Sequence, residues 1–457
     1  MPIPYAQSLI ALVRPLVKRV ASSPMIVGSA KGLFIQILGK VVGIALMLFM
    51  THVMTAHDFG VTSYARSWPA LLGPVLGFGF AGSAFRFIPE YTATGRPEAA
   101  HGYIRFTFWF AIAAGAFGLL GVGLYAWLMP AGVDNSRSAS LLIVAFCMPA
   151  AAAMAVQQAT CRAMGFNWLA YLPLLGLFPL INLVLAGAVY LITGRLGWQT
   201  LMFSFVISYA AAMAYQGIGL RMHLPQSFLD APPVYHLKQW FKVATPMFVT
   251  LVAAAVVTQG VIVIGGSMLP PKEVGLLSVC FQLVLFLSLI RVAVIGIIAP
   301  QTSAGHARGD HAGVFWQVAM GTALSAGLVL SGVLFFALFG PLVLFIFGKH
   351  FVAGYLVLMT FCANEAIITI AQPTFRLLTV TGREMQAAAC TLISAAVSVG
   401  GLFYLTPRYG VEGAALSAVI SSLLLAVLGF AVARPLLVEG YRAWRLKKHG
   451  APASATA

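Results

Sequence analysis

Long runs of apolar residues dominate the chain, and short polar connections separate them. A helix that crosses a membrane needs about 20 consecutive apolar residues, and runs of this kind predict twelve spans. The first six cover residues 33–51, 61–85, 106–129, 141–161, 168–193 and 199–220. The second six cover residues 244–268, 275–299, 314–340, 352–375, 387–406 and 413–433. The pattern therefore predicts an all-α integral membrane protein, with ten or fourteen spans as alternatives.

The predicted spans fall into two sets of six, and no connection is long enough to hold a soluble domain. Residues 221–243 contain three prolines and an amphipathic stretch, and they predict a cytoplasmic linker at the middle of the chain. The linker separates an N-terminal six-helix bundle, residues 27–220, from a C-terminal six-helix bundle, residues 244–434. Residues 1–26 predict a cytoplasmic amphipathic segment, and residues 435–457 form a basic cytoplasmic tail.

Short sequences in the first half return in the second half. The sequence DFGV at 58–61 corresponds to EVGL at 273–276, and RLG at 195–197 corresponds to RYG at 408–410. The two offsets, 215 and 213 residues, are nearly equal. Because six is an even number of spans, these repeats predict two bundles of parallel topology around an axis along the membrane normal. Chance similarity of such short strings is the alternative.

Composition supports lipid as the solvent of this chain. Hydrophobic residues make up 60% of the sequence, charged residues 8%, and the mean hydropathy is +0.94. So few charges exclude an ordinary soluble globule, in which about 25% of residues are charged. The five cysteines lie in apolar runs without metal-ligand or disulfide spacing, so we expect buried apolar side chains and no metal site. They are Cys147, Cys161, Cys280, Cys362 and Cys390.

The excess of positive charge follows the topology. The chain has 27 Lys and Arg against 11 Asp and Glu, a formal net charge of +16. In a soluble protein this would suggest nucleic-acid binding, but here the positive-inside rule applies. With the N-terminus cytoplasmic, 19 cations lie inside, 5 outside and 3 within spans, so both termini are expected in the cytoplasm. The five outer cations are Arg137, Arg195, Lys272, Lys349 and Arg408.

Residues 59–105, from FGVTSYARSW to EAAHGYIR, resemble the second-helix region of bacterial polysaccharide-transport proteins. The second half is similar too, in VGLLSVCFQLV from Val274, Pro300, the Phe347-Gly348 loop, LTVTGREMQAAA from Leu378 and PRYGVEGAALSA from Pro407. These proteins are the Wzx-like flippases for lipid-linked oligosaccharides in the multidrug/oligosaccharidyl-lipid/polysaccharide (MOP) superfamily. The resemblance runs over nearly the whole chain.

The resemblance implies two helical bundles around a central cavity. It implies a flippase that moves an undecaprenyl-pyrophosphate-linked oligosaccharide across the bacterial inner membrane by alternating access, for exopolysaccharide, capsule or O-antigen synthesis. The implied partners are this lipid-linked substrate, membrane lipids, and the polysaccharide polymerase and export machinery. A multidrug exporter of the same superfamily (MATE-like) is the alternative function.

Three cations lie within predicted spans: Lys40, Arg66 and Arg291. A charge within a span costs about 2.5–3.5 kcal/mol on insertion scales, so such residues usually pair, snorkel or serve a substrate. In related flippases, cations on early helices and on the eighth helix line the cavity, and these three resemble that pattern. They are therefore candidates to bind the pyrophosphate, because guanidinium groups suit bidentate phosphate binding. Snorkelling of Arg66, a local salt bridge of Lys40 and an Arg291–Glu365 ion pair are the alternatives.

Glu365 is the one carboxylate predicted well inside a span. It could take up and release a proton and so couple transport to a gradient, or it could form a structural ion pair with Arg291. Weaker candidates for contact with the substrate are polar residues in or beside spans, for which hydrogen bonding between helices is the alternative. They are Lys31, Gln157, Asn182, Gln259 and Gln282.

The charges within spans also bear on the competing functions. An exporter of cationic drugs should carry acids in the first span, and this chain has Lys40 there instead. A membrane polymerase or glycosyltransferase needs a catalytic group on an outer loop, and the outer acids here are scattered singly. No nucleophile–base pair or metal-ligand spacing is present. The sequence therefore predicts a transporter of an anionic substrate, with no catalytic residue, metal or cofactor.

Overall fold

A computed structural model describes residues 24–129 and 135–448, which are helical and contain no strand. The helices of the first half are α2 (Pro24–Val53), α3 (Ala56–Leu76), α4 (Phe80–Ala93), α5 (Pro97–Trp127), α6 (Asn135–Ala145), α7 (Met148–Ala163), α8 (Asn167–Tyr171), the π-helix η1 (Leu172–Leu177), α9 (Phe178–Thr193) and α10 (Trp198–His223). The short α11 (Gln226–Asp230) lies in the linker. The second half contains α12 (Leu237–Gly260), the π-helix η2 (Val261–Gly265), α13 (Pro271–Ala307), α14 (His311–Phe347), the 3-10 helix η3 (Lys349–Gly354), α15 (Tyr355–Val380) and α16 (Glu384–Lys448).

The helices account for twelve spans. Within the described residues, nine helices are long and apolar enough to cross a membrane, and two bent pairs, α3–α4 and α6–α7, could each form one more span. The 65-residue α16 consists of two helices joined at Gly410, where φ is 57° and ψ is −134°. Counting these two helices separately gives twelve spans in the described part of the chain. The predicted all-α membrane fold is confirmed.

Two predicted spans are bent rather than continuous. The span over 61–85 is divided between α3 and α4, whose axes differ by 44°. At this break Phe78 and Gly79 have positive φ values of 49° and 74°, and Pro74 precedes it. The span over 141–161 is divided between α6 and α7 with a bend of 49°. Apolar runs give no indication of these breaks, because a bent helix buries the same residue types.

Other helices extend further than the apolar runs predict. For example, α13 continues to Ala307, beyond the predicted end at 299, because polar residues continue a helix after it leaves hydrocarbon. The predicted amphipathic segment over 1–26 lies almost entirely outside the described residues.

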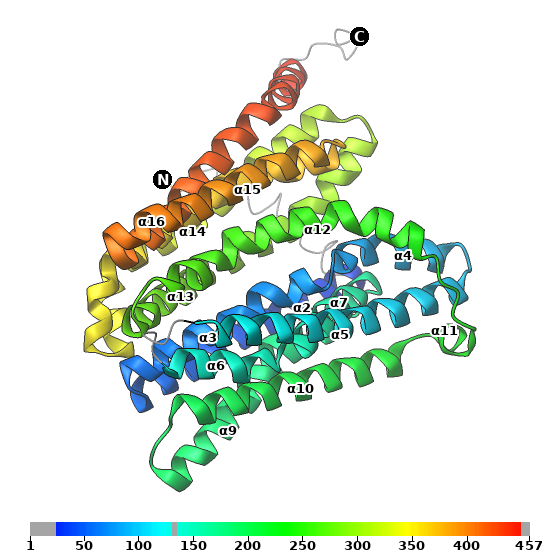
Figure 1. Cartoon of the computed structure of the whole chain (residues 1–457). Helices are drawn as coiled ribbons and strands as arrows, with labels where there is room; N and C mark the ends of the chain where they lie inside the picture. Colours follow the sequence, from blue (N-terminus) through cyan, green and yellow to red (C-terminus); the bar gives the residue numbers. More distant parts are fainter. Residues whose placement is uncertain (1–23, 130–134, 449–457) are drawn as a thin grey trace, which may run out of the picture.

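The two halves pack side by side, with the first half drawn blue to green and the second green to red in Figure 1. Their most extensive contact is between α3 and α13. It lies near the end where α2 meets α3 and α9 meets α10, which the charge count predicts to face outside; we call it the predicted outer end. There Gly60 and Gly275, at matching positions of the two repeats, meet: a Cβ added to Gly275 would lie 3.4 Å from Gly60 Cα.

Gly60 permits this contact because a side chain there would overlap the carbonyl oxygen of Pro271. We expect Gly60→Ala to destabilise the protein by about 1–3 kcal/mol, the usual range for overpacking, and to lower its unfolding midpoint by several degrees. Gly43→Ala is the matched control in α2, because no described atom lies within 4 Å of a Cβ at Gly43. Thermal unfolding in detergent measures both variants, and equal midpoints would contradict close backbone packing at Gly60.

Candidate substrate site

Lys40 of α2 and Arg66 of α3 lie in the same half, and their charges repel each other. The guanidinium carbon of Arg66 lies 5.8 Å from the ring centroid of Phe205 in α10, a cation–π contact. Both cations are half-buried. The structure thus brings together two of the three intramembrane cations that the sequence identifies.

Aromatic side chains of α9 and α10 stand beside Arg66. The ring of Phe178 lies 4.8 Å from that of Phe205 and 4.6 Å from that of Tyr209, measured between centroids. Tyr209 interacts electrostatically with both Arg66 and Cys147, and Cys147 lies at the break between α6 and α7. The amino-terminal end of α7 therefore lies in the same region. The site therefore combines two cations with an aromatic wall.

Within the described part of the chain, Lys40 and Arg66 have no acidic partner. Among residues 24–129 and 135–448, no carboxylate oxygen pairs with Lys40 or Arg66 within 4.0 Å. Two neighbouring cations without a carboxylate are unfavourable inside a membrane protein. The arrangement suits an anionic ligand, which would relieve the repulsion and accept hydrogen bonds from both side chains.

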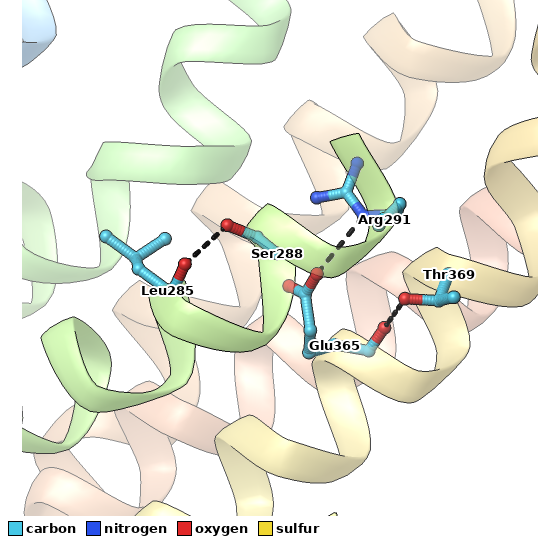
Figure 2. A network of polar contacts seen from close by, with 5 residues as sticks. All are labelled: Leu285, Ser288, Arg291, Glu365 and Thr369. Carbon is cyan, nitrogen blue, oxygen red and sulfur yellow. Dashed lines mark hydrogen bonds and ion pairs between the residues drawn. The ribbon is translucent and has the colours of Figure 1, made fainter. Parts of the chain in front are cut away.

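Arg291 and Glu365 form an ion pair in the second half. Arg291 Nε on α13 donates to Glu365 Oε1 on α15 at 3.1 Å. The two side chains are 17% and 6% exposed, so the pair is buried. Figure 2 shows the Nε edge of Arg291 facing the carboxylate, with the terminal guanidinium nitrogens on the far side. Arg291 belongs to the second half, whereas Lys40 and Arg66 belong to the first half. Arg291 has its own counterion, Glu365.

The weaker candidates are scattered over both halves. Gln157 is 6% exposed, and its amide lies against Gly217 of α10. Asn182 of α9 is fully buried, and neither polar atom of its side chain has a hydrogen-bond partner in the described part of the chain. Gln259 of α12 and Gln282 of α13 are half-buried. Lys31 belongs to α2, but its side chain lies outside the described residues.

The sequence does not predict the aromatic wall. Phe178, Phe205 and Tyr209 are ordinary apolar-run residues in the sequence. One indication exists, because Phe205 and Tyr209 are four residues apart and so share one face of a helix. Their partner Arg66 comes from a distant part of the chain, so the sequence could not show which face the rings present to it.

Comparisons with known proteins identify the fold. No protein-family model and no curated protein matches the chain. Among solved structures, an inward-facing multidrug resistance MATE family transporter of the MOP superfamily is similar with a TM-score of 0.69 and 14% identity, over 88% of this chain and 99% of that one. The lipid II flippase MurJ in its inward closed conformation also gives a TM-score of 0.69 at 14% identity, over 92% and 91% of the two chains.

A third structure is a MOP superfamily transporter from Pyrococcus furiosus whose binding pocket of reverse polarity suggests a different function. It is similar with a TM-score of 0.61 and 14% identity, over 92% of this chain and 98% of that one. These neighbours are transporters and flippases rather than enzymes. The chain therefore has the fold of the MOP-superfamily transporters.

Proposed function

We propose that the protein is a flippase for an undecaprenyl-pyrophosphate-linked oligosaccharide in the bacterial inner membrane, with both termini in the cytoplasm. The observation that carries the proposal is the pair Lys40 and Arg66, two mutually repelling cations with no carboxylate partner among the described residues. The similarity in fold to the lipid II flippase MurJ supports it, because that protein moves a lipid-linked substrate.

The chemistry of a pyrophosphate matches the site in two respects. It carries at least two negative charges, which Lys40 and Arg66 would neutralise. Its oxygens can accept two parallel hydrogen bonds from the planar guanidinium of Arg66, while the Lys40 ammonium acts as a point charge. The buried ring of Phe205, against which Phe178 packs, lies beside Arg66 and restricts the positions of its guanidinium. The lipid tail would stay in the bilayer beside the protein.

The Arg291–Glu365 pair has two candidate roles in this function. It can act as a structural tie between α13 and α15, as its burial suggests. It can also act as a switch, in which protonation of Glu365 releases Arg291 to bind the pyrophosphate. In the second role Glu365 would couple proton entry to substrate binding.

A multidrug exporter is the second candidate, because MATE family transporters are also similar in fold. Export of cationic drugs would need acidic groups where this chain has Lys40 and Arg66. The charge of the site therefore favours the flippase. The polysaccharide polymerase and export machinery remain proposed partners.

Transport by purified protein in liposomes tests the proposal. We expect a fluorescent undecaprenyl-pyrophosphate oligosaccharide to cross the bilayer of liposomes that contain the protein. The fraction of the fluorescent lipid that a membrane-impermeant quencher can reach measures this movement. An excess of the same lipid should inhibit this movement, and a cationic drug should not. Movement of the drug without movement of the lipid would overturn the proposed function in favour of the exporter.

A further inference from the structure

Arg137 joins the two halves at the predicted outer end. It lies in the first turn of α6, in the first half, and is only 6% exposed. Its Nη2 donates to the carbonyl oxygen of Leu269 at 2.6 Å, and its Nη1 approaches the carbonyl oxygen of Ser267 at 3.4 Å. Both acceptors belong to the second half. A buried cation thus reaches across the boundary between the two bundles.

The acceptors follow the end of the span formed by α12 and η2, which finishes at Gly265. Carbonyl groups at a helix C-terminus lack partners within the helix and carry a partial negative charge. A cation there is favourable, most of all when it is shielded from water. Arg137 therefore caps a helix of the second half with a side chain from the first half.

Tyr64 of α3 completes this contact. The guanidinium carbon of Arg137 lies 5.0 Å from the ring centroid of Tyr64, and the same ring packs against Gly266. Tyr64 is one helical turn beyond Gly60, whose backbone meets Gly275 and Pro271. The hydrogen bonds of Arg137, the Tyr64 ring and the glycine contact therefore close the same end of the molecule.

We infer that Arg137 is the latch that holds the two halves closed at the predicted outer end, and that its hydrogen bonds to residues 267–269 break when this end opens. The Leu269 and Ser267 carbonyls are on one bundle and the guanidinium is on the other, so separating the bundles must separate these atoms. The inference rests on the alternating-access part of the proposed function and does not depend on the substrate.

Accessibility of a buried position tests the latch. Val274 is fully buried and precedes Gly275, which meets Gly60 of the first half, so Val274→Cys is a reporter for opening of this end. In a background with the five native cysteines replaced, purified protein in nanodiscs is treated with a hydrophilic maleimide. We expect Arg137→Ala to raise the labelling rate of the reporter at least tenfold. Arg195→Ala, which removes an exposed cation from the connection between α9 and α10, should leave the rate unchanged.

Arg137→Lys provides a second measure that retains the charge. A lysine lacks the fork needed to reach both carbonyls, so we expect a labelling rate several times that of the parent. The latch would be overturned if Arg137→Lys were labelled at the same rate as Arg195→Ala. The same holds for Arg137→Ala if that variant folds. Because the assay contains no substrate, this failure would leave the proposed function standing. If Arg137→Ala and Arg137→Lys lose lipid transport but neither is labelled faster than the parent, the latch is contradicted and the proposed function is not.

Discussion

Arg66→Ala should reduce lipid transport to nearly the level of liposomes without protein. The side chain is the one group of the Lys40–Arg66 pair that can bind pyrophosphate with two parallel hydrogen bonds. Charge-assisted hydrogen bonds contribute about 1.5–3 kcal/mol each, so the loss of two weakens binding by a factor of about a hundred to ten thousand. Arg66→Lys keeps the charge without the planar fork, and we expect it to retain part of the activity.

The same substitution should leave stability unchanged or raise it. In the protein without substrate, Arg66 repels Lys40, and no carboxylate among the described residues offsets this repulsion. A residue kept for binding rather than for folding shows this combination of lost function and retained stability. Transport in liposomes and thermal unfolding in detergent measure the two effects.

Arg195→Ala is the matched control for Arg66→Ala, because Arg195 is an exposed arginine in the same half. It should retain transport and stability. Arg66→Ala with normal transport would remove Arg66 from the proposed site. Arg66→Ala that unfolds well below the parent would instead indicate a structural role.

Loss of Glu365 should destabilise the protein strongly. Glu365→Ala leaves the buried cation of Arg291 without a counterion, and breaking a buried pair in this way costs about 3–5 kcal/mol. Replacing both partners with apolar residues, as in Arg291→Met with Glu365→Leu, should restore most of that stability, because neither charge is then left unpaired. Chemical denaturation in detergent micelles measures the difference.

The Arg86–Glu90 pair supplies the control for this experiment. Its atoms are 3.8 Å apart, and both side chains are exposed. Exposed pairs contribute about 0–1 kcal/mol, so Glu90→Ala should change stability little. Equal effects of Glu365→Ala and Glu90→Ala would contradict a stabilising role for the buried pair.

Glu365→Gln separates the structural role from coupling. The amide keeps the size of the side chain and cannot ionise. If Glu365 exchanges protons during transport, transport by the variant should lose its dependence on pH. Transport that follows the parent across a pH series would exclude Glu365 as the coupling residue and leave the structural role.

The sequence predicts the spans because apolar runs record contact with lipid directly. It also suggests which positions of the two repeats correspond, but it does not predict that Gly60 and Gly275 meet between α3 and α13. Pairing of Arg291 with Glu365 could be weighed from the sequence, since each is a rare charge within a span. These features can be predicted because each depends on the residue types of a short segment and not on contacts with distant segments.

Features that depend on partners from distant segments were not predicted. Arg137 was counted among the outer loop cations, yet it is buried against Tyr64 and the end of the α12–η2 span. At the break between α3 and α4, the ring of Phe78 stacks on that of Phe248 of α12, with centroids 4.6 Å apart. A hydropathy pattern predicts neither contact, because it assigns an arginine or a phenylalanine the same value whatever its side chain packs against.

The contact at Gly60 and Gly275 also bears on how fast the halves can move. Most packed helices interlock through side chains, which must leave one set of grooves before they enter another. At Gly60 and Gly275 backbone lies against backbone, with the ring of Phe59 beside Gly275. If the predicted outer end opens as proposed, this contact separates, and a surface made largely of backbone leaves few interlocked side chains to withdraw. The rate of opening would then be governed by the attachments around the contact and not by the contact itself.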